Sequence, residues 1–235
     1  MVAPSVPNNC QGCPHYGHSL LGACQRNELE LISNGKLHQS YHKGQVIFQQ
    51  GSRPGGIYCI HQGKVKISKI SADGKEQIVR LAREGDVLGY RSLMMGGNFS
   101  TAATALTDCV VCLVPRPDFF SIINQNPQFA QSLLRLLAQA LGETEERLLH
   151  TAYKPVRERL AEALLMLHRL FDPGTNARFS IPISRDDLAA LMGTAKETAS
   201  RLLSELREEG LVATQGSRIT VLDVVRLRQV ATMYS

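Results

Sequence analysis

The stretch "ISRDDLAALMGTAKETASRLLSELREEGLVATQGSRITV", residues 183–221, decides the fold of the C-terminal part of the chain. Ser184 can cap a helix over "RDDLAALM", because its hydroxyl accepts a free N–H of the first turn and two aspartates there favour the helix dipole. Gly193 permits a tight turn, and Thr194 can cap a second helix that ends at Gly210. Two short helices joined by a glycine turn predict a helix-turn-helix, and "VATQGSRITV" adds a β-hairpin wing that can touch phosphates.

The second of these helices carries the side chains that we expect to contact DNA. Polar residues gather near its exposed N-terminal end, where a recognition helix meets base edges in the major groove. Arg201 can donate a bidentate pair to a guanine, and Glu197 can accept from a cytosine amino group. The candidate DNA-binding residues are Thr194, Lys196, Glu197, Ser200, Arg201 and Arg218. An ordinary solvated helix face is the alternative interpretation of "KETASR".

The N-terminal half of the chain has a different pattern. From about Tyr41 to Pro115 it consists of short alternating apolar segments punctuated by glycines, which predicts a compact β barrel or roll. Within it, "ADGK" at 72–75 predicts a tight hairpin, since Asp-Gly readily takes positive φ angles.

A long helix is expected between these two regions, over "FAQSLLRLLAQALGETEERLLHTAY". Its apolar residues recur every three or four positions as a narrow seam, which favours burial against a copy of the same helix. The seam residues are Leu134, Leu137, Leu141, Thr144 and Leu148. Packing of this stripe on the chain's own β domain is the alternative. Because polar Thr144 and nearby glutamates weaken pairing, we expect either a marginal homodimer that a signal controls or a constitutive dimer.

Composition places the chain among ordinary globular proteins. Hydrophobic residues make up 43% and charged residues 20%, no apolar run has the length of a membrane span, and no signal-peptide pattern is seen. We therefore expect a soluble, cytoplasmic protein without a membrane partner. The net charge of +5 and the pI near 9.0 fit a nucleic-acid partner. No nucleophile-and-base motif stands out, so we do not expect an enzyme.

The N-terminus holds the stretch "CQGCPHYGHSLLGAC", residues 10–24, which contains three cysteines and two histidines. In a cytosolic chain such cysteines favour metal ligands or redox sensors over structural disulfides. Cys59 and Cys109 lie in strand-like segments, and we expect them to be small buried hydrophobes without a functional role.

Over nearly its whole length the chain resembles the CRP/FNR superfamily of bacterial transcription regulators, with "REGDVLG" in a glycine-rich roll, a long helix and a winged helix-turn-helix. The resemblance implies an α+β fold with a cyclic-nucleotide-binding-like β-roll as sensor domain. The expected parts are a cysteine-rich segment at 1–27, the β-roll at 28–125, a dimerisation helix at 126–152 and the DNA-binding domain at 153–235. "ETASR" resembles the FNR-type recognition motif, which implies palindromic double-stranded DNA with TTGAT-like half-sites and RNA polymerase as a partner.

FNR-type members bind a [4Fe-4S] cluster through closely spaced N-terminal cysteines and one cysteine of the β-roll, and soft thiolates suit such clusters. The resemblance implies the candidate ligands Cys10, Cys13, Cys24 and Cys112. Cys24 departs from the family spacing, because it lies eleven residues after Cys13 and Ser19 occupies the usual place. Cys24 can reach a cluster through a longer loop, or His15 or His18 can serve in its place.

The same resemblance argues against binding of cyclic AMP. Members that bind cyclic AMP carry a glutamate soon after the "GD" turn and an Arg-Ser or Arg-Thr pair further on. Here Tyr90 stands where the glutamate would fall and Ser100 where the arginine would fall. A cyclic phosphate would therefore lose a charge-assisted pair.

Other functions of the cysteines stay open on sequence grounds. A structural zinc site of Cys10, Cys13, Cys24 and a histidine or Cys112 would be colourless and indifferent to oxygen. A haem, direct thiol oxidation or another small-molecule effector can serve on the same scaffold. A thiol oxidoreductase using Cys10 and Cys13 is the most distant alternative, since that pair precedes the folded core and lacks the strand-to-helix setting that lowers a thiol pKa.

Overall fold

The computed structural model describes residues 9–175 and 178–232, so the first eight residues of the expected cysteine-rich segment lie outside the described part. The fold is α+β, as predicted. In the described ranges, no helix has both the length and the apolar composition needed to cross a membrane.

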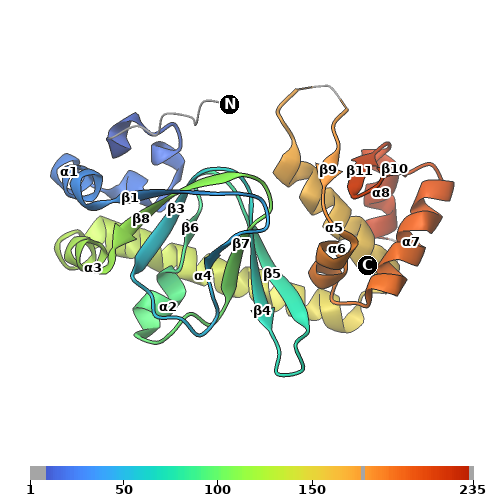
Figure 1. Ribbon diagram of the computed structural model, residues 1–235, viewed down its shortest axis with the longest axis horizontal. Coiled ribbons are helices and arrows are strands. Elements are labelled where there is room, and N and C mark those ends of the chain that lie inside the picture. Colours follow the sequence, from blue (N-terminus) through green and yellow to red (C-terminus); the bar gives the residue numbers. More distant parts are fainter. Residues whose placement is uncertain (1–8, 176–177, 233–235) are drawn as a thin grey trace. The chain divides into compact units, whose positions relative to one another are not determined.

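Two compact units make up the fold (Figure 1). The first comprises the chain up to Ile70 together with Arg80–Gly142, and the second comprises Ser71–Val79 together with the chain from Glu143 onward. The first unit holds the predicted β-roll except for Ser71–Val79, and the second holds the helix-turn-helix with its own small sheet.

The β-roll is built from eight strands in two antiparallel sheets. They are β1 (Leu37–Tyr41), β2 (Val46–Phe48), β3 (Gly56–Gln62), β4 (Val65–Ile70), β5 (Glu76–Ala82), β6 (Val87–Leu88), β7 (Ala102–Ala105) and β8 (Cys109–Pro115). The first sheet has the order β1-β8-β3-β6 and the second the order β2-β7-β4-β5. The predicted hairpin joins β4 and β5, with Gly74 at a φ of +79° and the N–H of Ser71 donating to the carbonyl of Lys75 at 3.0 Å.

Helices and short 3-10 turns complete the first unit. The helices are α1 (Arg26–Gly35), α2 (Tyr90–Met95), α3 (Arg116–Gln125) and the first part of α4 (Pro127–Tyr153), which continues into the second unit at Glu143. The turns are η1 (Cys10–Gly12), η2 (Tyr16–His18) and η3 (Leu20–Ala23). Helices α1 and α3 pack against each other beside the first sheet (Figure 1). The three turns precede α1 and fold the N-terminal segment compactly.

The N-terminal cysteine segment belongs to the core of this unit. Cys10, Leu21 and Cys24 are buried in one hydrophobic cluster. Their neighbours in that cluster include Ile32, Ile57, Val114, Phe119 and Phe129. The expectation that the cysteine pair precedes the folded core is therefore wrong. The physical reason is that successive 3-10 turns bring leucines and thiols, which behave as small hydrophobes, to one side of the segment, where burying them is favourable.

Asn126 ties this segment to the start of α4. Its side-chain oxygen accepts from the N–H groups of Gln128 and Phe129 at 2.9 and 3.0 Å, which caps the helix. Its side-chain nitrogen donates to a carboxylate oxygen of Glu28 at 2.7 Å and to the carbonyl of Ala23 at 3.0 Å. Asn126 and Glu28 are both buried, so water does not compete for these bonds.

Replacing Asn126 by alanine is expected to lower the free energy of unfolding by about 2–4 kcal/mol. This range is the sum of two losses: the helix cap, and one of the hydrogen-bond donors to the buried Glu28 carboxylate. Urea unfolding followed by circular dichroism measures the change. Asn124→Ala, at an exposed position of α3, is the matched control and should stay within about 0.5 kcal/mol of the unchanged protein. An equal loss in both variants would contradict this role of Asn126.

The second unit contains the predicted winged helix-turn-helix. Its elements are α5 (Val156–Phe171), β9 (Ile181–Pro182), α6 (Arg185–Met192), α7 (Lys196–Glu208), β10 (Val212–Gln215), β11 (Arg218–Val221) and α8 (Val224–Ala231). The three strands form a sheet of order β10-β11-β9. Strands β10 and β11 are the predicted wing, and Gly216 takes a φ of +57° in the turn between them.

The two predicted helix caps have different outcomes. Ser184 caps α6 as predicted, with its hydroxyl oxygen accepting a first-turn N–H at 2.9 Å. The prediction that Thr194 caps α7 is wrong, because Ala195 is the N-cap. Gly193 takes a φ of +66°, and the N–H of Thr194 turns back to the carbonyl of Ala189 at 3.1 Å. Thr194 thus belongs to the turn, and the extended backbone that a cap requires falls one residue later.

Candidate functional site

A small cavity of about 40 Å³ lies in the first unit, lined by the N-terminal turns, α1 and its end, and the first sheet. We call it the cysteine pocket, with the lining residues Cys10, Cys13, His15, Tyr16, Ser19, Leu21, Ile32, Lys36, Cys59, Ile60, His61, Gly85, Cys112 and Val114. Four of these are thiols from three separate parts of the chain: the N-terminal segment, β3 and β8. Apolar walls keep bulk water from much of the pocket.

The first sheet sets two of the thiols side by side. In the antiparallel register Cys112 of β8 pairs with Cys59 of β3 on one side and with His38 of β1 on the other. Residues directly opposite each other on antiparallel strands point to the same face of the sheet. His61 follows in β3 at an irregularity of the register, and such bulges re-aim a side chain. One side of the sheet therefore presents thiols and imidazoles to the N-terminal segment.

Three of the pocket thiols have nitrogen partners. The pairs are Cys10 Sγ with Lys36 Nζ at 3.4 Å, Cys13 Sγ with His61 Nδ1 at 3.5 Å, and Cys112 Sγ with His38 Nδ1 at 3.3 Å. Lys36 is buried, so its ammonium acts on the pocket with little screening. Burial lowers the pKa of both His38 and His61, and the Lys36 charge lowers it further.

Burial disfavours the ionised form of the thiols in this region. It raises the pKa of Cys112 to about 11 and the pKa of Cys24 to about 12, where Glu28 and Cys10 add to the effect. The pKa of Cys59 is also raised, first by burial and then by charge on the neighbouring cysteines, foremost Cys112. Because the ionised thiol is the nucleophile, burial makes Cys112, Cys24 and Cys59 poor nucleophiles. All six cysteines lie in the described ranges and are free thiols.

The pocket differs from the sequence-based ligand set at two cysteines. It brings together Cys10, Cys13 and Cys112. Cys24 follows η3, is buried in the hydrophobic cluster and does not line the pocket. Cys59, which the sequence suggests to be a plain core residue, does line it.

The pocket also has histidine and lysine side chains that the sequence motifs do not identify. Of the two histidines weighed as ligands, His15 lines the pocket and His18 is exposed. The sequence motifs do not point to Lys36 and His61, which line the pocket, or to His38, which contacts Cys112 without lining it. For His61 a signal existed in "YCIHQ", where a cysteine and a histidine interrupt an apolar strand within three positions. Lys36 and His38 carry no comparable local signal.

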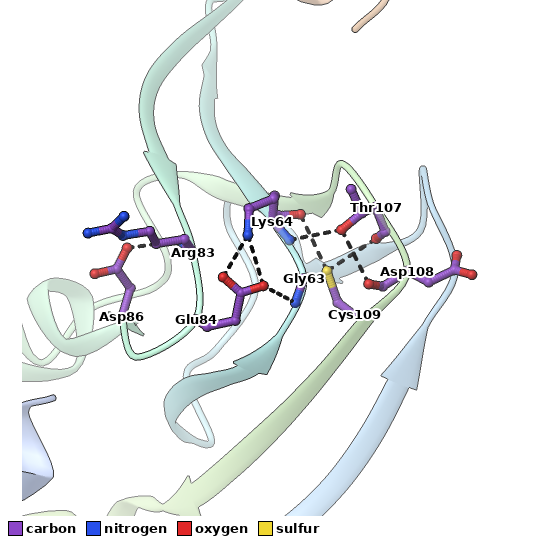
Figure 2. Close-up of polar contacts among 8 residues, drawn as sticks. All are labelled: Gly63, Lys64, Arg83, Glu84, Asp86, Thr107, Asp108 and Cys109. Atoms are coloured by element: carbon purple, nitrogen blue, oxygen red, sulfur yellow. Dashed lines mark hydrogen bonds and ion pairs between the residues drawn. The ribbon is translucent and has the colours of Figure 1, made fainter. Parts of the chain in front are cut away.

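Cys109 lies in a different environment, shown in Figure 2. Its thiol donates to the backbone carbonyls of Lys64 and Thr107 at 3.3 and 3.2 Å. The Lys64 ammonium pairs with the Glu84 carboxylate at 2.7 Å, and Glu84 also accepts the N–H of Gly63 at 2.9 Å (Figure 2). Cys109 is buried in this network and does not line the pocket, in agreement with its expected structural role.

The thiols surround a cavity rather than a point. Among residues 9–175 and 178–232, no three His, Cys, Asp or Glu side chains lie close enough together to hold a single metal ion. A tetrahedral zinc needs its sulfur ligands all at about 2.3 Å from one ion.

The N-terminal end of α7 is the exposed part of the helix-turn-helix. Lys196, Glu197 and Arg201 are exposed, and Ser200 is half-buried on the same helix. Two of the cations have partners, Lys196 with Asp186 at 2.9 Å and Arg201 with Glu205 one turn on. The remaining two DNA candidates are half-buried Thr194 in the turn and exposed Arg218 on the wing, which donates to Ser180 at 3.2 Å. The cationic side chains can exchange these contacts for nucleic acid.

The predicted seam of α4 is largely uncovered in the single chain. Leu134, Leu141 and Leu148 are 64%, 60% and 69% exposed, and Thr144 is exposed as well. Leu137 instead packs against the hydrophobic cluster of the first unit and is half-buried. Three large apolar side chains at seven-residue spacing on one helix are unusual on a solvated surface.

Comparison with known proteins assigns both halves of the chain. A cyclic nucleotide-binding domain matches residues 38–126, and a Crp-like helix-turn-helix domain matches residues 158–230. A cyclic AMP receptor protein of Thermus thermophilus is 32% identical, with 92% of this chain and 97% of that protein covered. The transcriptional activator protein FnrL of Cereibacter sphaeroides is 27% identical, with coverages of 97% and 94%. A crystal structure of a CRP/FNR-family transcriptional regulator from Thermus thermophilus is 26% identical, with a TM-score of 0.71 and coverages of 83% and 98%.

Proposed function

The chain belongs to the CRP/FNR family of DNA-binding transcription regulators, and from that premise we propose that it senses oxygen or redox state through an iron–sulfur cluster in the cysteine pocket. Proteins of this family are transcription regulators rather than enzymes. The observation that carries the proposal is the meeting of four thiols from three parts of the chain in one pocket. A [4Fe-4S] cluster, when bound, would supply a group whose state depends on oxygen.

The donor set fits such a group. Cys10, Cys13 and Cys112 would hold it, with a fourth ligand from Cys24 or Cys59. Thiolates gathered in an apolar pocket repel one another, and bound iron together with the Lys36 ammonium would offset that repulsion. The same chemistry gives less support to thiol oxidation, which needs an ionised thiol, because burial disfavours ionisation here.

The contacts of Asn126 support a route from the pocket to α4. This side chain holds the carbonyl of Ala23, the residue before Cys24, and caps the first turn of α4 with its other end. A bound cluster would fix the N-terminal segment and so hold this cap in place. Loss of the cluster would free the segment, and α4 would lose part of what fixes its first turn.

Pairing of α4 with a copy of itself is the proposed output. The exposed leucines of the seam would be covered in a homodimer, which places two recognition helices for successive major grooves. Glu197, Ser200 and Arg201 would then contact bases in palindromic TTGAT-like half-sites, and Lys196, Thr194 and Arg218 would contact the backbone. RNA polymerase is the further partner that this role implies.

Cyclic AMP receives less support as the signal, although one relative is a cyclic AMP receptor protein by name. Tyr90, which stands where a ribose-binding glutamate is expected, is 2% exposed and packs in the hydrophobic cluster. Phe48 and Phe99 stack at 4.1 Å inside the roll, with Tyr58 beside them. Ser100 supplies no cation for a cyclic phosphate.

Anaerobic purification is the direct test. We expect a coloured protein with broad absorbance near the visible–ultraviolet boundary and with iron and acid-labile sulfide in equal amounts. Air should bleach the colour and weaken binding to a TTGAT-type palindrome, measured by fluorescence anisotropy with and without cyclic AMP.

Two results would count against this proposal. A colourless protein that contains zinc would show that the site holds a structural metal ion instead of a cluster. DNA binding that responds to cyclic AMP but not to air would show that cyclic AMP is the signal.

A further inference from the structure

We infer that Cys59 of β3, rather than Cys24 of the N-terminal segment, is the fourth thiolate of the cysteine pocket. The inference rests on the proposed function, because it names a ligand of the proposed cluster. Its basis is the position of the two thiols: Cys59 lines the pocket together with Cys10, Cys13 and Cys112, and Cys24 does not.

The sheet fixes Cys59 in a place from which it can act with Cys112. The two residues are direct partners in the antiparallel register of β3 and β8, so their side chains leave the sheet on the same face. His38, the other partner of Cys112, contacts its sulfur at 3.3 Å. A rigid pair of strands holds ligands more precisely than a loop does, since the ladder fixes the backbone before any metal binds.

The N-terminal segment faces this pair with Cys10 and Cys13. Cys10 is anchored because its N–H donates to the hydroxyl of Ser33 at 2.9 Å. Cys13 reaches across to the sheet, where its sulfur lies 3.5 Å from His61 Nδ1. Two thiols of the N-terminal segment and two thiols of the strands therefore line the same cavity. A cubane cluster takes four thiolate ligands.

Cys24 sits in a setting that suits a structural thiol. It is 7% exposed, lies in the hydrophobic cluster, and its N–H donates to the carbonyl of Leu21 at 2.9 Å. The buried carboxylate of Glu28 lies near it and accepts from the N–H of Gln25 at 2.6 Å and from Asn126 at 2.7 Å. A thiolate of a negatively charged cluster would be repelled by that carboxylate.

Serine replacements distinguish the two thiols. The variants Cys59→Ser, Cys24→Ser, Cys112→Ser and Cys109→Ser are prepared anaerobically, loaded with iron and sulfide, and desalted. Iron and acid-labile sulfide per chain and the visible absorbance are then measured. Cys59→Ser and Cys112→Ser should weaken retention of iron by more than the ~10–100-fold that loss of an outer-shell partner costs. Cys24→Ser should retain iron as the unchanged protein does.

Cys109 supplies the matched control. It lies three residues from Cys112 in the same strand, on the opposite face, and its thiol donates to the backbone carbonyls of Lys64 and Thr107 (Figure 2). Cys109→Ser should therefore leave the iron content unchanged. Circular dichroism of each iron-free variant checks folding, and Cys59→Ala and Cys24→Ala repeat the comparison without a new buried hydroxyl.

The outcomes separate this inference from the function on which it rests. Loss of iron in the Cys24 variants, whether alone or together with the Cys59 variants, overturns the inference but leaves the cluster in place. Retention in both sets overturns it too and points to an imidazole, such as that of His61, as the fourth ligand. If the unchanged protein takes up no iron, both the proposed function and this inference are wrong.

Discussion

Replacement of Leu141 by glutamate is expected to convert the proposed dimer to a monomer and to lower affinity for a palindromic site by at least ~100-fold. Leu141 is 60% exposed in the single chain and stands at the centre of the α4 seam, so a dimer would bury it against its own copy. Glutamate there would place two like charges across the two-fold axis. A monomer would also bind each half-site separately, and joining the two half-site contacts in one dimer raises the apparent affinity about 10²–10⁴-fold.

Sedimentation velocity and fluorescence anisotropy measure the two effects. Gln139→Glu is the matched control, because it adds the same charge to an exposed position on the other side of α4 and should leave both measurements unchanged. A Leu141→Glu protein that still sediments as a dimer would show that the seam is not the interface. The unchanged protein, measured before and after air, decides between the two expected kinds of dimer, since a constant dimer mass would exclude control through dissociation.

The helix-turn-helix was predictable from the sequence because its signals are local. Ser184, the positive-φ Gly193 and the Gly216 hairpin each announce a turn or cap within a few residues. The one error, at Thr194, is a shift of a single position. The N-cap is the residue with the extended backbone, which here is Ala195. The residue types alone favoured Thr194, because it has a hydroxyl group that can cap a helix.

The cysteine pocket was only partly predictable because its geometry is not local. Cys59 and Cys112 meet through a strand register that joins positions more than fifty residues apart, and a lone cysteine in an apolar strand ordinarily belongs to the core. The same holds for the contact of Asn126 with Ala23 and Glu28. The family resemblance therefore favoured Cys24, as the third cysteine of the N-terminal segment and despite its unusual spacing, whereas the position of each thiol in space favours Cys59.

Arg201→Ala is expected to weaken binding to a TTGAT-type palindrome by about 2–6 kcal/mol, which is roughly 30-fold to 20,000-fold. The loss is a bidentate guanine contact worth about 1–3 kcal/mol in each of two half-sites. In the free chain Arg201 is exposed and paired with Glu205, and Glu205 also lies 3.5 Å from Arg157. The Glu205 carboxylate therefore keeps a cationic partner when Arg201 turns to DNA, so opening the pair costs little.

A comparison of matched and altered palindromes shows whether Arg201 reads a base. With the guanine of each half-site replaced, the unchanged protein should fall to the affinity of Arg201→Ala, and the variant should show no further loss. Arg207→Ala is the matched control, because Arg207 is an exposed arginine at the far end of α7 and should keep the preference for guanine. If Arg201→Ala binds both palindromes more weakly by the same factor, and the slope of log affinity against log salt falls by about two, or about one for each half-site, then Arg201 contacts a phosphate and the base reader lies elsewhere on the helix.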